Sequence, residues 1–322
     1  MFSDGGFLIL GPMGKMQLWF PSAAKEESKL LAPLTKGLFW VKASENGSFP
    51  YCNCLWVNTD MRVLIDTNPG QEDLPGLIAA HPEVVINTHF HEDHVTNNSC
   101  FNDAEFWAAA ADVPAIESVQ GFMDYYGFAD YQLEKLGCRF LQEWHINPVR
   151  VARKLHADEI LDFGWLKLQV IALPGHTPGH IGFWEEKTGL LYSTDVDLSK
   201  YGPWYGHKCS DLGDFAASLQ LCLDLAPARL LSAHSRMYED KIAFRLQRFL
   251  DIIYQREEQV LVHLRAGAST PEDLTGRGII YGAQVKRTAY VDFTEKIALI
   301  KHLDWLLAKG IIRKQAEHYF IA

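Results

Sequence analysis

The chain of 322 residues lacks several features that would mark it as a special class of protein. It has no apolar run of about eighteen residues, so we expect no transmembrane helix and no membrane partner. Its N-terminus opens with an acidic residue, Asp4, rather than a basic one before the apolar patch, which is a poor secretory signal. The six cysteines are scattered, which argues against a disulfide scaffold and favours the reducing cytoplasm. Internal repeats and low-complexity segments are also missing from the sequence.

An excess of positive charge is missing too. The net charge is −10, which disfavours a broad nucleic-acid surface because phosphate binding relies on Lys and Arg. Residues 241–322 hold 13 Lys and Arg against 9 Asp and Glu, a net of +4, which leaves −14 for residues 1–240. The acidic part disfavours a polyanionic substrate, whereas the basic end permits nucleic-acid contact without requiring it. Hydrophobic residues make up 48% and charged residues 22%, as in an ordinary globular protein.

The first two thirds of the chain alternate between groups of strands and helices. Short apolar runs bounded by turn residues predict strands at residues 38–42, 54–57, 61–65, 84–88, 105–110, 159–163, 166–171, 180–184, 190–194 and 229–232. Amphipathic segments predict helices at residues 72–80, 116–128 and 211–225. Residues 1–37 are expected to form strands or irregular edge structure. Potential ligand residues come at the strand ends or in the loops that follow, which is where α/β folds place their sites.

After residue 236 the sequence becomes mainly helical. Helices are predicted at residues 237–264 and 294–309, with a short helix between them that starts at Thr270-Pro271 and a strand or hairpin over residues 311–321. This order is winged-helix-like, and it predicts two domains, residues 1–236 and 237–322. The simpler interpretation is a small helical domain that packs through its apolar faces or forms a homodimer through them.

The segment that organises the chain lies directly after the predicted strand 84–88. His89, His91, Asp93 and His94 fall within six residues of one another. In an extended segment the side chains at i and i+2 share a face, so His89 and His91 can hold one ion. A turn after them would carry Asp93 and His94 towards a second ion. Imidazole and carboxylate together suit zinc and its first-row neighbours.

Five segments, taken in order, resemble the metallo-β-lactamase superfamily: Leu64–Thr67, His89–His94, Leu173–His180, Tyr192–Asp195 and Leu231–His234. The resemblance covers about residues 38–236 and implies a four-layer αββα sandwich, here followed by the helical end. It also implies that His89, His91 and His176 hold one metal, that Asp93, His94 and His234 hold a second, and that Asp195 bridges them. Thr194 stands where the family often has Gly. The ligand set is similar to that of the glyoxalase II and lactonase branches, and the C-terminal region resembles that of lactamase-beta-like hydrolases.

Further residues are expected around this centre. The resemblance makes Asp93 and Asp195 the catalytic residues. Asp66 is expected to fix the ligand loop from behind, with a turn-capping Asp as the alternative, and His180 is expected to be a packed residue or one that supports a ligand. The segment after Asp195 predicts a substrate pocket, with an exposed loop as the alternative, from Tyr201, Trp204, Tyr205 and His207.

The leading hypothesis is a hydrolase that uses a bridging hydroxide between two divalent ions to cleave a small-molecule ester, thioester or lactone. Zinc is the first choice of metal, and iron or manganese are alternatives because the same ligands accept them. Two other enzymes stay open, an endoribonuclease and a mononuclear iron persulfide dioxygenase. A metal-dependent sensor whose tail binds DNA or a protein is the non-enzymatic alternative.

Overall fold

The computed structural model describes residues 31–322, so most of the prediction for residues 1–37 lies outside the described residues. The first sheet has seven strands in sequence order. These are β1 (Leu31–Thr35), β2 (Leu38–Val41), β3 (Cys54–Asn58), β4 (Arg62–Ile65), β5 (Val84–Asn87), β6 (Glu105–Ala109) and β7 (Val151–Leu155). The pairs from β1 to β4 are antiparallel and those from β4 to β7 are parallel.

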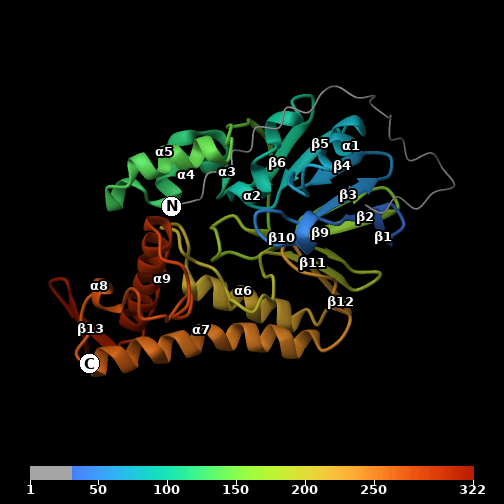
Figure 1. The fold of residues 1–322 in the computed structure, drawn as a ribbon. Helices are drawn as coiled ribbons and strands as arrows, with labels where there is room; N and C mark the ends of the chain where they lie inside the picture. The colour runs from blue at the N-terminus through green and yellow to red at the C-terminus, as the bar shows by residue number, and fades with distance from the viewer. Residues whose placement is uncertain (1–30) are drawn as a thin grey trace.

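The second sheet has five strands in the order β12-β11-β10-β9-β8. Its members are β8 (Ile160–Phe163), β9 (Leu166–Ala172), β10 (Ile181–Glu185), β11 (Leu190–Thr194) and β12 (Arg229–Ser232), and only β11 and β12 pair in parallel. Apolar side chains of both sheets form one buried cluster, in which Ile65 and Ile86 of the first sheet join Val170 and Phe183 of the second. The two sheets therefore pack face to face (Figure 1).

Helices cover the outer face of each sheet (Figure 1). Those on the side of the first sheet are α1 (Leu74–Ala79), α2 (Glu92–Val95), α3 (Val113–Glu117), α4 (Val119–Tyr126) and α5 (Glu134–Glu143), with 3-10 turns at Ser44–Gly47, Asn98–Cys100 and Ala129–Tyr131. Leu74 and Leu77 of α1 pack with Leu64 and Val85 of that sheet. Helices α6 (Leu212–Asp224) and α7 (Ile242–Arg265) pack on the second sheet through Leu219 and Leu246. The predicted αββα order is confirmed.

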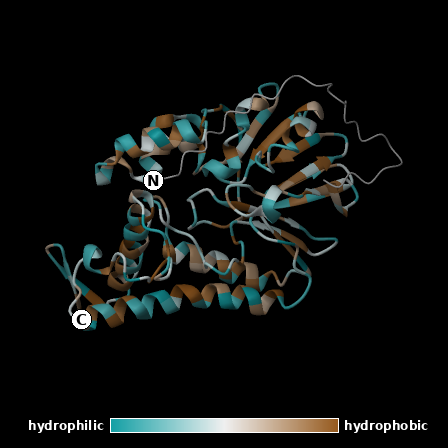
Figure 2. Ribbon diagram, viewed as in Figure 1, coloured by the Kyte–Doolittle hydropathy of each residue, from teal (hydrophilic) through white to brown (hydrophobic). Residues whose placement is uncertain are grey.

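The C-terminal segment continues from α7 into α8 (Pro271–Leu274), α9 (Ala289–Ala308) and a hairpin of β13 (Ile312–Gln315) and β14 (His318–Ile321). Thr270 caps α8 in a capping box with Asp273, as its sequence predicts. Figure 2 shows α7 with hydrophilic and hydrophobic residues in alternation, as expected of a helix with one buried face. None of the helices within residues 31–322 is long and apolar enough to cross a membrane.

Several element boundaries differ from the sequence predictions for local reasons. Helix α7 starts at Ile242 rather than at residue 237, because Tyr238 exchanges backbone hydrogen bonds with Leu230 of β12. The helix predicted over residues 116–128 is two helices. Ser118 between them is extended, and its hydroxyl accepts a hydrogen bond from Gly121 N and so caps α4. Strand β7 and helix α5 were not predicted.

Candidate metal centre

Four strand ends bring the predicted ligands to one edge of the sandwich. His89 and His91 follow β5 directly, and the short helix α2 then carries Asp93 and His94. His176 lies in the loop after β9, Asp195 directly follows β11, and His234 comes two residues after β12. Because these are all carboxyl ends of strands, residues more than a hundred positions apart meet in one place.

The seven predicted ligands form two adjoining groups. Ligand atoms of His89, His91, His176 and Asp195 lie within 4.8 Å of one another, and those of Asp93, His94 and His234 do the same. Asp195 touches both groups. Its Oδ2 lies 3.2 Å from His176 Nε2 and 3.4 Å from His234 Nε2, and its Oδ1 lies 3.1 Å from His94 Nε2. The position of Asp195 is therefore that of a carboxylate able to bridge two ions.

The donor atoms at this centre fit bound metal ions. Among the described residues, four buried atoms here have no hydrogen-bond partner, namely Nε2 of His89, His94 and His176 and Oδ1 of Asp195. Unpartnered polar atoms are costly to bury, by about 1–3 kcal/mol each. Their convergence on one point from the segments after three strands, β5, β9 and β11, is explained if divalent cations complete their coordination.

The outer ring nitrogens of four histidines are each anchored by an oxygen atom. His94 Nδ1 lies 2.8 Å from Asp66 Oδ2, and His176 Nδ1 lies 2.8 Å from the Trp204 carbonyl oxygen. His234 Nδ1 lies 2.9 Å from the Gly47 carbonyl oxygen and 3.0 Å from that of Tyr51, and His89 Nδ1 lies 3.2 Å from Thr88 Oγ1. In each case Nε2 is left to face the centre, where it is available to bind a metal.

His91 is held differently, because its Nε2 lies 2.9 Å from Nδ1 of another imidazole, that of His207. The ring nitrogen of His91 that remains for a metal is therefore Nδ1. His89 and His91 would thus bind one ion through different nitrogens, and only His91 has a side chain from beyond Asp195 as its outer partner.

Asp66 and His180 lie where supporting residues are expected. Asp66 accepts hydrogen bonds from Thr88 N at 2.9 Å and Thr88 Oγ1 at 2.8 Å, in addition to its contact with His94. It does more than cap a turn, since it holds the ligand loop and one ligand together. His180 is buried behind Asp195, with Nδ1 at 2.8 Å from the Leu173 carbonyl oxygen and Nε2 at 3.2 Å from Asp195 N.

The four residues predicted for a substrate pocket have separate positions. Trp204 lies beside the centre, with its ring 5.5 Å from that of His91 and 5.7 Å from that of His176. Tyr201 is 68% exposed. Tyr205 is 1% exposed and belongs to the hydrophobic core, where its hydroxyl pairs with His302 and Arg256, so its assignment to the pocket is wrong.

His207 also differs from its predicted role as a polar pocket residue. It is buried, and both of its ring nitrogens already have partners, His91 and Tyr290. A substrate could not pair with this imidazole unless one of those contacts opened. The alternation of aromatic and polar residues in the segment resembles a pocket wall, but it conveys nothing about which side chains turn inward.

The histidines of the centre differ in the direction in which their pKa values are shifted. Burial lowers the pKa of His89 and of His91 well below the usual value, which keeps them neutral and able to bind a metal. Burial also acts to lower the pKa of His94 and of His234, but the net shift of both is upward. The raising groups are Cys52, Asp195, Asp66 and Asp93 for His94, and Asp195 and Asp93 for His234. The pKa of Asp195 is well below normal because these imidazoles outweigh the effect of its burial.

Asp112 is a supporting residue that the sequence motifs did not indicate. It follows the end of β6 and accepts hydrogen bonds from Phe90 N at 3.1 Å, Gly179 N at 2.6 Å and Thr177 Oγ1 at 2.7 Å. It therefore ties the loop of His89 and His91 to the loop of His176. Its position after a strand, like that of the predicted ligands, is the signal that could have identified it.

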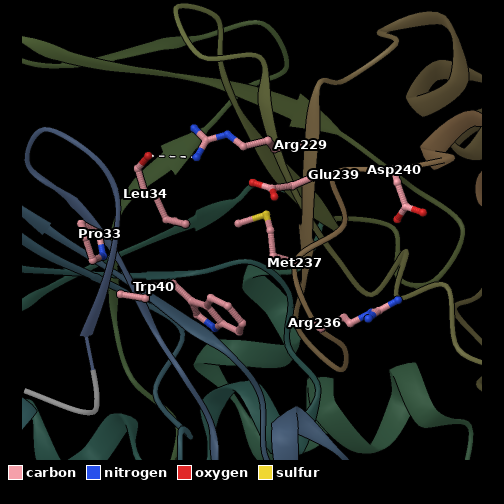
Figure 3. Close-up of a pocket in the computed structure, with 9 residues that line it drawn as sticks. Pro33, Leu34, Trp40, Arg229, Arg236, Met237, Glu239 and Asp240 are labelled. Carbon is pink, nitrogen blue, oxygen red and sulfur yellow. Dashed lines mark hydrogen bonds between the residues drawn. The ribbon is translucent and has the colours of Figure 1, made fainter.

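A separate cavity of about 540 Å³ lies away from the metal centre, where β1 and β2 approach the segment after β12. Figure 3 shows Arg229 reaching across it to the Leu34 carbonyl oxygen, a hydrogen bond of 3.0 Å. The remaining lining residues are Ala32, Pro33, Trp40, Arg236, Met237, Glu239 and Asp240. None of the predicted ligands lines this cavity.

Two facing mixed sheets, covered by helices and carrying a His and Asp centre at the strand ends, define an α/β protein of the metallohydrolase type. Comparison with known families makes this specific. The model of the metallo-beta-lactamase superfamily matches residues 47–234, more than half of the chain, and the protein belongs to this superfamily of metal-binding hydrolases.

Relatives of known name are distant. The chain is 25% identical over 236 residues to the acyl-coenzyme A thioesterase MBLAC2 of Gallus gallus, covering 66% of this chain and 83% of that protein. It is 24% identical over 220 residues to the beta-lactamase-like protein 2 homolog of Drosophila melanogaster, covering 62% of this chain and 63% of that one. The chain thus spans just under two thirds of the Drosophila relative.

Two solved structures share the fold over nearly the whole chain. A metallo-beta-lactamase family protein from Thermus thermophilus has a TM-score of 0.71 and 21% identity, covering 90% of this chain and all (100%) of that one. A beta-lactamase domain protein from Burkholderia ambifaria also has a TM-score of 0.71, with 18% identity, covering 91% of this chain and 94% of that one. At these sequence identities the likeness concerns the fold alone. Because 90% or more of this chain is covered, the shared fold includes C-terminal helices.

Proposed function

We propose that the protein is a dinuclear metallohydrolase that cleaves a carboxylic thioester, ester or lactone. The observation that carries this proposal is the convergence of four unpartnered buried ligand atoms, three from histidines and one from Asp195, which also contacts both groups of ligands. Support for an acyl substrate comes from the named activity of the Gallus gallus relative and from the aromatic ring of Trp204 beside His91 and His176.

The roles proposed for the chain follow from its contacts. His89, His91 and His176 would hold one ion, Asp93, His94 and His234 the other, and Asp195 would join the two. Two divalent ions held in this way supply a hydroxide nucleophile near neutral pH and a positive charge to polarise a carbonyl oxygen. Asp66 keeps His94 oriented, and Asp93 and Asp195 are the carboxylates placed to accept a proton near the reacting group.

Replacement of a central ligand tests the proposal. We expect Asp195→Ala and His89→Ala to lose metal and to hydrolyse model thioesters and lactones at least about a hundredfold more slowly, since even the outer partners of ligands are worth 10–100-fold. His156→Ala, at an exposed position outside the centre, is the matched control and should match the wild type. Elemental analysis should find two divalent ions per wild-type chain.

The same experiment separates the alternatives. A single iron per chain with persulfide oxidation would select the dioxygenase instead. Turnover of phosphodiesters or RNA without turnover of thioesters or lactones would select the nuclease. Unchanged hydrolysis by an Asp195→Ala variant verified to have lost metal would overturn the proposed centre itself.

A further inference from the structure

His207 connects the metal centre with the C-terminal helices. It lies in the loop between β11 and α6, buried against Tyr126, whose ring centroid is 3.6 Å away, and Trp204, whose ring centroid is 4.4 Å away. Its Nδ1 lies 2.9 Å from His91 Nε2, and its Nε2 lies 3.3 Å from the hydroxyl of Tyr290 in α9. His207 is outside both groups of predicted ligands, so it contacts a ligand without being one.

The direction of these hydrogen bonds follows from metal binding. If His91 binds an ion through Nδ1, that nitrogen carries no proton, so the proton of the neutral ring is on Nε2. His91 Nε2–H then donates to His207 Nδ1, which must be unprotonated. The proton of His207 is consequently on Nε2, from where it donates to the Tyr290 hydroxyl oxygen. With an ion bound at His91 Nδ1, the two hydrogen bonds can run only from His91 to His207 and from His207 to Tyr290.

Tyr290 is well placed to hold this arrangement. Its ring stacks on Phe140 of α5, with the centroids 5.4 Å apart, and burial raises the pKa of its hydroxyl well above the usual value, so the group stays neutral. The other four histidines of the centre are anchored by oxygen atoms from residues 47 to 204. Among these five histidines, His91 is the one whose outer ring nitrogen is paired with another imidazole, and that imidazole reaches Tyr290 of the C-terminal segment.

We propose that His207 is a positioning residue for His91 and that Tyr290, by accepting the hydrogen bond from His207 Nε2, holds His207 in place, so that helix α9 takes part in holding the first ion. This inference rests on the metal centre of the proposed function but not on its substrate. Outer partners of metal-binding histidines fix ring orientation and ligand basicity, and their loss costs about 10–100-fold in metal affinity.

Two replacements of similar size separate hydrogen bonding from packing. In His207→Asn the amide oxygen can accept the proton of His91 Nε2, whereas His207→Leu offers no acceptor. In titrations of Zn²⁺ against a chromogenic chelator, we expect His207→Leu to weaken one of the two Zn²⁺ sites by about 10–100-fold and to leave the other unchanged. His207→Asn should stay within about threefold of the wild type, since a net hydrogen bond is retained.

Tyr290→Phe tests the second contact. Loss of one hydrogen bond of about 0.5–1.5 kcal/mol should weaken the same site about twofold to tenfold. Tyr319→Phe is the control, because Tyr319 is a buried tyrosine of the C-terminal hairpin whose ring lies beside Lys314 rather than beside His207 or Trp204. On a His207→Leu background, Tyr290→Phe should have no further effect, as expected if it acts through His207.

Unchanged Zn²⁺ affinity in Tyr290→Phe and His207→Leu, or an equal loss in the Asn and Leu variants, would overturn the inference. If His207→Leu does not fold, as judged by far-UV circular dichroism of the metal-free chain, the pair Tyr290→Phe and Tyr319→Phe decides alone. A wild type that binds two Zn²⁺ ions but hydrolyses no thioester, ester or lactone would overturn the proposed substrate only. The Zn²⁺ titrations would still test His207.

Discussion

Asp112 shows how one carboxyl group at a strand end can organise two ligand loops. It receives hydrogen bonds from Phe90 on one loop and from Thr177 and Gly179 on the other. Burial raises its pKa to about 6 from the usual 3.8, despite the opposing effect of those hydrogen bonds. At the scale of the residue, the alignment of His91 and His176 therefore depends on a group that contacts neither imidazole by a hydrogen bond.

The raised pKa of Asp112 predicts a pH dependence of stability. Between pH 3.8 and about 6 the folded chain holds a proton that the unfolded chain releases. The stability contributed by this group is therefore present below pH 3.8 and is lost as the pH rises through 6. The loss amounts to about 3 kcal/mol at most, at 1.36 kcal/mol per pKa unit.

Asp112→Asn removes that titration. We expect the free energy of unfolding of the metal-free wild type, measured in urea, to fall relative to that of the Asn variant as the pH rises from 4 to 7. Two profiles that stay parallel over this range would show that the carboxyl group titrates normally.

At the scale of elements, the loop that carries His176 depends on a close approach to α6. Gly175 has φ of +116°, and a Cβ atom on it would lie 2.1 Å from the backbone nitrogen of Phe215 in α6. The Gly175 carbonyl oxygen also accepts a hydrogen bond from Asp211 N at 2.9 Å, just before α6 begins. Glycine is needed here for its backbone conformation and for its lack of a side chain.

Gly175→Ala should therefore displace the loop from α6 and shift His176. We expect a loss of stability above about 3 kcal/mol, since backbone strain of about 1–3 kcal/mol adds to a clash with backbone atoms. Weaker Zn²⁺ binding should accompany it.

Gly267→Ala is the matched control for this prediction. Gly267 has a similar φ of +102°, but nothing lies within 4 Å of an added Cβ. Gly267→Ala should lose only the stability that a left-handed backbone takes from a residue with a side chain, about 1–2 kcal/mol. Equal losses of stability in the two variants, measured by chemical unfolding, would show that the approach to α6 does not matter.

At the scale of the whole molecule, the packing crosses the predicted domain boundary between residues 236 and 237. One buried cluster joins Ile171 of β9 and Phe215 of α6 to Ile253 of α7 and Leu303 of α9. Phe293 of α9 packs into a different cluster, with helices α3 to α5. Buried Arg256 of α7 donates to the carbonyl oxygens of Tyr201 and Pro203, in the loop that carries Trp204 and His207. The winged-helix-like description and the two-domain division stay predictions, but residues on both sides of the boundary share a core.

A chain ending at residue 236 should therefore not fold on its own. It would expose the apolar face of α6 and lose the partner of His207, so we expect no cooperative thermal transition and no tight Zn²⁺ binding. A chain ending at Gly310 is the control. It lacks only the β13–β14 hairpin, whose buried contribution to this core is Ile312 and Tyr319, and should fold and bind Zn²⁺ with reduced stability. Cooperative unfolding of residues 1–236 would support an independent first domain.

Local apolar patterns predicted most of the strands, and the resemblance of five segments to the metallo-β-lactamase superfamily implied the fold class and the seven residues that meet at the centre. Strands can be predicted from short segments because period-two apolar patterns are local, and ligands at the carboxyl ends of strands meet once the sheets form. Helix α5 and strand β7 were missed because α5 is amphipathic but weakly apolar, and because β7 exposes three of its five residues.

The sequence could not show how the side chains of the loop after β11 are oriented. Tyr205 and His207 are two residues apart in one loop, yet Tyr205 enters the core beside Arg256 while His207 reaches His91. Their orientations depend on α7 and α9, which lie more than thirty residues further along the chain. Packing against these distant helices sets the contacts of Tyr205 and His207, and a local sequence pattern cannot predict such contacts.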